Sequence, residues 1–158
     1  AEKLHIPEAD TRYGYLFGAL GAGAILGAYL VGKFAARKRS GLLMIMGAMT
    51  FSITLFLVGF ATNYFVALTL FLIIGIAAVS QLATANSLTQ KLAPESLRGR
   101  AVSVHMFAMA GTQAFGAIFA GRTAQLFGIS FSLCSGAAIL FFFTVGVILF
   151  RRSVLDIE

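Results

Sequence analysis

The sequence predicts an all-α membrane protein with five transmembrane helices. Of its 158 residues, 59% are hydrophobic and 11% are charged, whereas a soluble domain is about 45–50% apolar and about 25% charged. The mean hydropathy is +0.91. Long apolar runs alternate with short polar segments that carry the charges. A water-soluble globule could not bury this much apolar surface, so the bilayer is the expected solvent.

The N-terminal third contains two predicted spans. Residues 1–13 are polar and are predicted to form an extracytoplasmic loop. The first span is predicted over residues 14–32, which is long enough for a hydrocarbon core of about 30 Å at about 1.5 Å per residue. A basic segment, residues 33–40, precedes a second span over residues 41–61.

Small residues recur in the first span. The four-residue spacing of its glycines places them on one helix face and lets a second helix approach closely. We therefore predict helix packing at Gly18, Gly23 and Gly27. A further interpretation is that this face is smooth so that it can slide during a conformational cycle. That interpretation also requires the helix packing.

The third span is predicted over residues 65–90, and it becomes polar in its second half. Hydroxyl and amide side chains there must face other helices or an aqueous cavity, because exposure of amides to lipid is costly. Two roles remain open for these side chains: hydrogen bonding between helices, or lining of a substrate path. The polar residues concerned are Ser80, Gln81, Thr84, Asn86, Ser87, Thr89 and Gln90.

A polar link, residues 92–100, separates the third and fourth spans. Pro94 cannot continue a helix and biases Ala93 away from helical dihedral angles. Gly99 is expected to let the backbone turn before the next helix. Arg98 and Arg100, so close to hydrocarbon-length segments, are expected at a water interface.

The last two spans are predicted over residues 101–121 and 129–150, with a turn over residues 123–128. His105, Met109, Thr112 and Gly116 share one helix stripe, with Gln113 beside it. An interfacial or structural role for His105 is favoured over proton handling. Gly116 and Gly121 are predicted packing residues. The transmembrane bundle thus covers residues 14–152, followed by a tail over residues 153–158.

The basic residues divide unequally between the two sides. Nine of them fall on the side of the link and three on the other, which by the positive-inside rule predicts an external N-terminus and a cytoplasmic C-terminal tail. The nine are Lys33, Arg37, Lys38, Arg39, Lys91, Arg98, Arg100, Arg151 and Arg152; the three are Lys3, Arg12 and Arg122.

The residue types argue against an enzyme. Every carboxylate lies in a predicted loop or terminus, and no paired carboxylates or metal-ligand spacing occur within the spans. No cofactor or metal is therefore expected. Nucleic-acid binding is excluded as well, because the basic residues lie between apolar runs and not on one face with interleaved aromatic residues.

Three segments together resemble the C-terminal half of a major facilitator superfamily transporter, closest to the bacterial drug and siderophore exporter branch. YGYLFGALGAGAILGAYL (13–30) resembles the eighth helix of that branch. NSLTQKLAPESLRGRAVSV (86–104) resembles the end of the tenth helix, the cytoplasmic P-x-x-x-R-G-R link and the start of the eleventh. GTQAFGAIFAGRTAQLFG (111–128) resembles the eleventh helix and the following turn. Members of the family commonly carry an acidic residue near the end of the eleventh helix, where this sequence has Gln125.

The resemblance implies a partial C-terminal helix bundle, helices eight to twelve, in the bacterial inner membrane. It implies a part of a secondary active transporter that exports small molecules, such as drugs or siderophores, by alternating access. The partners would be the lipid bilayer, the missing N-terminal half and the substrate. Pro94, Arg98, Gly99 and Arg100 would form the cytoplasmic link; Gln81, Thr84, Thr112 and Gln113 are the candidates for the cavity lining. The alternative is a non-transporting membrane remnant or an assembly subunit of a larger membrane complex.

Overall fold

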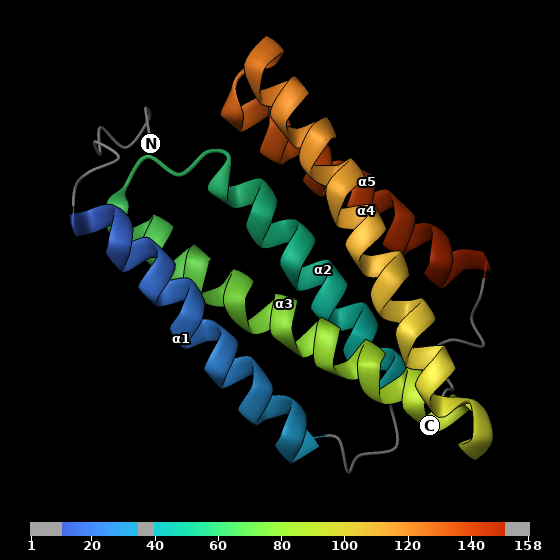
Figure 1. Ribbon diagram of the computed structural model, residues 1–158. Helices are drawn as coiled ribbons and strands as arrows, with labels where there is room; N and C mark the ends of the chain where they lie inside the picture. The colour runs from blue at the N-terminus through green and yellow to red at the C-terminus, as the bar shows by residue number, and fades with distance from the viewer. Residues whose placement is uncertain (1–10, 35–39, 151–158) are drawn as a thin grey trace.

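The computed structural model describes residues 11–34 and 40–150, and these contain helices and no strand. The helices are α1 (Thr11–Phe34), α2 (Ser40–Val58), α3 (Tyr64–Leu92), the short 3₁₀ helix η2 (Glu95–Leu97), α4 (Arg98–Phe127) and α5 (Ile129–Phe150) (Figure 1). Five of them are long and apolar enough to cross a membrane. The predicted all-α membrane fold with five spans is confirmed.

The connection between α4 and α5 is much shorter than predicted. Residues 123–127 continue α4, and the chain reverses at Gly128 alone, where φ is +87°. The Gly128 N–H donates to the Ala124 carbonyl oxygen at 3.0 Å. Because glycine has no Cβ, it adopts this left-handed conformation without strain, and α5 begins at once with Ile129. The prediction of a turn over residues 123–128 was therefore wrong.

The link between α3 and α4 is formed by proline, not by glycine. Ala93 and Pro94 are extended, with ψ angles of 135° and 148°. Pro94 lacks an N–H and forces the preceding residue out of the helical region, which ends α3. Leu97 N–H then donates to the Pro94 carbonyl at 2.9 Å and closes η2. Gly99 already lies in the first turn of α4, so the expectation that it makes the turn was wrong.

The connection between α2 and α3 is a tight, capped turn. The Asn63 side chain accepts a hydrogen bond from the Phe65 N–H at 2.9 Å and so caps the N-terminus of α3. The Tyr64 hydroxyl donates to the Arg12 carbonyl oxygen at 3.0 Å. This bond joins the beginning of α3 to the beginning of α1.

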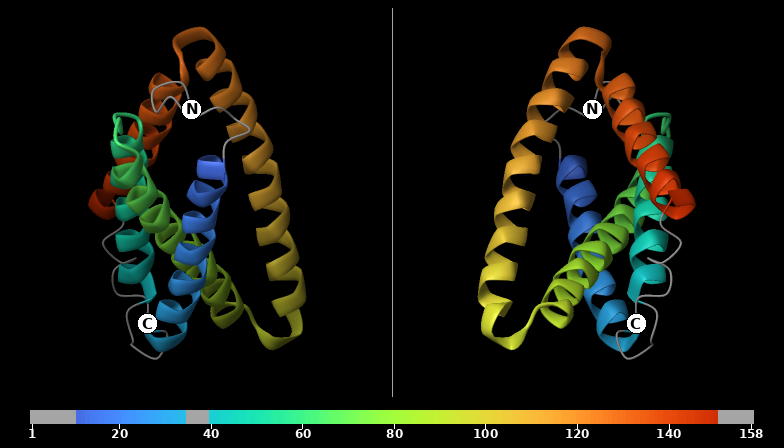
Figure 2. Two further views of the ribbon diagram at one scale, coloured as in Figure 1. Left: turned by 90° about the vertical axis from the view of Figure 1, so that its left-hand side faces the viewer. Right: turned by 90° about the vertical axis from the view of Figure 1, so that its right-hand side faces the viewer.

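The order of the helices in space differs from their order in the chain. The most extensive contact between two helices is the one between α1 and α3. In addition, α2 packs on α3, α5 packs on α2, and α4 packs on α5. Figure 2 shows α4 meeting α3 at the link and diverging from it along the rest of its length. None of the residues of α4, all of which are described, is buried. The other four helices thus form the packed part of the bundle, and α4 stands apart from α1 and α3.

The two ends of the bundle can be named from these connections. The end that carries the α3–α4 link is called the link end here, and it also holds the C-terminus of α1 and the N-terminus of α2, because successive helices run in opposite directions (Figure 1). The opposite end carries the α2–α3 turn and Gly128.

Candidate functional site

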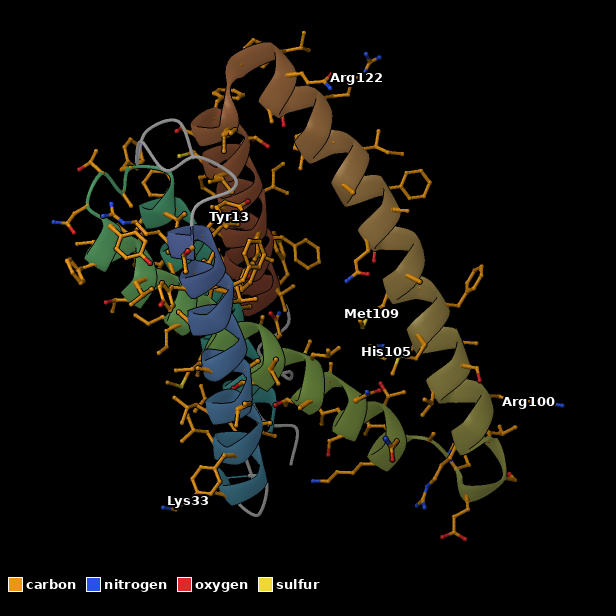
Figure 3. All side chains as sticks on the ribbon, turned by 60° about the vertical axis from the view of Figure 1, so that its left-hand side comes forward. Tyr13, Lys33, Arg100, His105, Met109 and Arg122 are labelled. Atoms are coloured by element: carbon orange, nitrogen blue, oxygen red, sulfur yellow. The ribbon has the colours of Figure 1, made fainter. Side chains whose placement is uncertain are left out.

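The link residues are at the surface and are held by only one weak ion pair that the structure records. Pro94, Arg98, Gly99 and Arg100 are all exposed. Arg98 Nη2 lies 3.9 Å from Glu95 Oε1, with the two side chains 53% and 91% exposed. Such an exposed pair contributes about 0–1 kcal/mol. In Figure 3, Arg100 points away from the rest of the bundle. The link therefore presents its guanidinium groups outward.

Two of the five predicted packing glycines lie against another helix. A Cβ on Gly23 would overlap the Leu72 carbonyl oxygen of α3, and one on Gly27 would lie 2.6 Å from that of Ile76. From the other side, a Cβ on Gly75 of α3 would overlap the Leu20 carbonyl oxygen of α1. α1 and α3 thus approach each other main chain to main chain.

The other three predicted packing glycines face open space. A Cβ added at Gly18, Gly116 or Gly121 would meet no described atom within 4 Å outside its own helix backbone and immediate neighbours. For Gly116 and Gly121 this follows from the position of α4, which diverges from its neighbours.

The structure does not bring the four candidate cavity residues together. Thr84 is buried, and its hydroxyl donates to the Ser80 carbonyl at 2.7 Å. Gln81 faces α2, where its Cβ would be 3.5 Å from a Cβ placed on Gly47. Thr112 and Gln113 are exposed on α4, and the Thr112 hydroxyl donates to the Ala108 carbonyl at 2.9 Å. The first pair thus belongs to the packed layer and the second to the separate helix.

Two further polar groups stand out on the helices that meet at the link. The Asn86 Oδ1 atom of α3 and the His105 Nε2 atom of α4 are buried and have no hydrogen-bond partner among the described residues. His105 and Met109 project from α4 toward the side on which α1 and α3 lie (Figure 3). Buried polar atoms are normally paired, so these two atoms are exceptions within the described chain.

The sequence contained the signal for both residues, but it did not separate them from their neighbours. An amide and an imidazole inside a hydrophobic span are each unusual. Asn86 was one of seven polar residues in the second half of its span. His105 was interpreted as interfacial or structural because it lies about one turn from the link. Only the structure distinguishes atoms with a partner, such as the Thr84 and Thr112 hydroxyls, from atoms without one.

Two apolar crevices also interrupt the packed layer. Crevice 1 lies between α1, α2 and α3, has a volume of about 250 Å³ and includes Thr84 in its wall. Crevice 2 lies between α2 and α5 and has a volume of about 260 Å³. Neither wall contains a charged side chain. Thr84, predicted to line a substrate path, thus lines a crevice on the packed layer.

Among the residues that the structure describes, Glu95 is the one carboxylate, and no group of three His, Cys, Asp or Glu side chains could hold a metal ion. Besides basic side chains near the helix ends and the Cys134 thiol, the polar side chains of the described helices are amides, hydroxyls and one imidazole. Such groups recognise a ligand by hydrogen bonds and do not by themselves form an acid–base pair.

Comparison with known protein families assigns the chain to one of them. The sequence pattern of the family described as transmembrane secretion effector, which is of the major facilitator type, matches residues 4–158. Comparison with curated proteins and with solved structures finds no match to this chain. The family match confirms the resemblance to the major facilitator superfamily and covers nearly the whole sequence. The chain, with its five membrane-spanning helices, therefore belongs to the transmembrane secretion effector family, a family of transporters.

Proposed function

We propose that this chain forms part of a secondary active transporter in the bacterial inner membrane, which exports small molecules such as drugs or siderophores by alternating access. The observation that carries the proposal is the position of α4, which has no buried residue and diverges from α3. Membership of a transporter family supports it.

The path is proposed to run between α3 and α4. Asn86 Oδ1 and His105 Nε2 supply polar atoms without a partner in the described chain, and Thr112 and Gln113 add an exposed hydroxyl and amide further along α4. Polar side chains inside a membrane mark substrate and ion pathways in transporters. A substrate with both apolar and hydrogen-bonding parts would suit these walls.

The second wall is proposed to come from an N-terminal transporter half. Substrate sites in such carriers lie near the midplane between two repeats that rock against each other. Five helices supply one wall, so we expect no transport by this chain alone. Arg98 and Arg100, exposed at the link end, are proposed to lie at the cytoplasmic face and to make contacts that differ between the two states.

Transport is tested in a bacterial strain that lacks its major exporters. The chain is expressed alone or together with the N-terminal half of the transporter. The accumulation of fluorescent drugs and of a siderophore inside the cells is then measured. We expect lower accumulation of at least one compound when both halves are present. Equal accumulation of every compound would contradict export and favour a non-transporting membrane subunit.

The role of the link is tested in the same assay. The double variant Arg98→Ala/Arg100→Ala is compared with Ser96→Ala, a change at an exposed link residue. We expect the double variant to reduce export at equal amounts of protein in the membrane, and the serine variant to export normally. Unchanged export by the double variant would remove the arginines from the mechanism.

A further inference from the structure

Crevice 1 is lined almost entirely by carbon. Its apolar walls come from all three helices, with Leu30 of α1, Met46 of α2 and Ile76 of α3 among them. Leu30 is 37% exposed and Met46 is 57% exposed. The crevice is thus open to the surroundings of the bundle and not sealed within it.

The crevice offers little to a polar ligand. Its polar side chains are three hydroxyls. Ser80 Oγ donates to the Gly27 carbonyl at 3.3 Å, and Thr84 Oγ1 donates to the Ser80 carbonyl at 2.7 Å. Because these two donors are already used within the protein, an occupant gains mainly from apolar contact.

A basic residue of α1 lies one turn beyond the lining of the crevice. Lys33 is exposed in the last turn of α1, three residues after Leu30, which is a neighbouring position on a helix surface. The long lysine side chain can keep its ammonium group at the water interface while the helix remains in the hydrocarbon. A cation thus lies one helical turn beyond Leu30, a lining residue of the crevice, in the last turn of α1.

We propose that crevice 1 binds an anionic phospholipid of the leaflet at the link end, with an acyl chain between α1, α2 and α3 and the phosphate beside Lys33. The helices span a membrane, so phospholipid is the apolar and anionic molecule that surrounds them. The part of α2 that lines the crevice, residues 43–50, rises by about 10 Å at about 1.5 Å per residue. That length lies within one leaflet, which is about 15 Å of a hydrocarbon core of about 30 Å.

Crevice 2 provides an internal comparison. It has nearly the same volume and is lined by side chains such as Ile53 and Phe142. Neither α2 nor α5 carries a lysine or an arginine. Crevice 2 should therefore accept acyl chains without preference for the headgroup, whereas crevice 1 should select a negative one.

The protein contains no tryptophan, so a single introduced tryptophan reports on each crevice. Met46→Trp places the reporter at crevice 1, and Ile53→Trp places it at crevice 2. Both positions are on α2, and the Ile53 side chain is 51% exposed. Each variant is reconstituted in phosphatidylcholine with a fixed fraction of brominated phosphatidylglycerol or brominated phosphatidylcholine. Bromine quenches the fluorescence of a nearby indole, so quenching measures relative lipid binding.

We expect Met46→Trp to favour the brominated phosphatidylglycerol about fivefold, the preference that one lysine supplies near an anionic lipid surface. The preference should disappear when Lys33→Gln is added. It should remain with Lys91→Gln, which removes a different exposed cation at the same end of the bundle. Ile53→Trp should be quenched equally by the two lipids.

Three results would overturn the proposal: equal quenching of Met46→Trp by the two lipids, a preference that survives Lys33→Gln, or the same preference at Ile53→Trp. Absence of quenching by either lipid at Met46→Trp would also overturn it, because another occupant would then fill crevice 1. If Met46→Trp does not fold, Leu30→Trp serves as the reporter on α1.

Discussion

Gly27 of α1 lies directly against the main chain of α3 at Ile76, where an added Cβ would stand 2.6 Å from the carbonyl oxygen. One turn further along α3, Ser80 Oγ donates to the carbonyl oxygen of Gly27 itself at 3.3 Å. The two helices are thus in contact without an intervening side chain. In a bilayer, where lipid tails are as apolar as leucine, such close packing and interhelical hydrogen bonds drive association.

Gly27→Ala should destabilise the bundle. The new methyl group meets backbone, which cannot rotate away, so α1 and α3 must separate slightly. Overpacking of this kind costs about 1–3 kcal/mol. Thermal unfolding in detergent, followed by circular dichroism, measures the loss. Gly21→Ala is the matched control, because a Cβ there meets no described atom within 4 Å; equal melting temperatures for the two variants would refute the predicted clash.

Ser52→Ala should weaken the contact between α2 and α5. Ser52 is 1% exposed, and its hydroxyl donates to the Ala137 carbonyl at 2.7 Å. Hydrogen bonds between transmembrane helices contribute about 0.6 kcal/mol on average and up to about 1.7 kcal/mol. The same unfolding assay should show a loss in this range. Ser103→Ala, whose hydroxyl bonds only within α4, should change stability less; the opposite order would contradict the assigned role.

The number and type of elements were predictable because a bilayer leaves few choices. A segment without water must satisfy its backbone hydrogen bonds internally, so an apolar run of sufficient length becomes a helix. The predicted span over residues 129–150 coincides with α5. The predicted end at residue 121 was six residues short of Phe127. Arg122 resembled an interfacial residue, whereas the backbone continues as a helix until Gly128, where φ becomes positive.

Asn86→Ala and His105→Ala should each weaken transport by the complete transporter. If these atoms hold the substrate, each variant loses a hydrogen bond of about 0.5–1.5 kcal/mol, which is about two- to twelvefold in apparent affinity. Export is measured against substrate concentration at equal protein levels in the membrane. Val104→Ala changes a 68% exposed neighbour of His105 and should leave affinity unchanged. Normal affinity in both polar variants would remove them from the path.

Sidedness can be tested with cysteine labelling, because Cys134 is the only cysteine in the sequence. In a Cys134→Ser background, Thr62→Cys places a thiol in the exposed α2–α3 turn and Ser96→Cys places one in the exposed link. A membrane-impermeant maleimide added to whole cells should label the first and not the second. Both should react after the membrane is permeabilised. The reverse pattern would invert the predicted topology.

The candidate site was less predictable than the spans because hydropathy does not fix the rotation of a helix. In a soluble protein one apolar stripe faces the core, but in lipid both faces of a helix can be apolar. Thr84 and Thr112 therefore looked alike in the sequence. The structure places the first in the packed layer and the second on exposed α4. The unpaired atoms of Asn86 and His105 could be recognised only from the burial and the hydrogen-bond partners of each atom in the folded chain.

The position of α4 has a consequence for how the protein is made. α4 meets α3 beside the link and packs along α5, yet α5 leaves the ribosome after it. Until the one-residue reversal at Gly128 has formed and α5 has entered the bilayer to pack on α2, α4 lacks its main neighbour. The packing of α4 therefore depends more on α5, which follows it in the chain, than on α3, which precedes it.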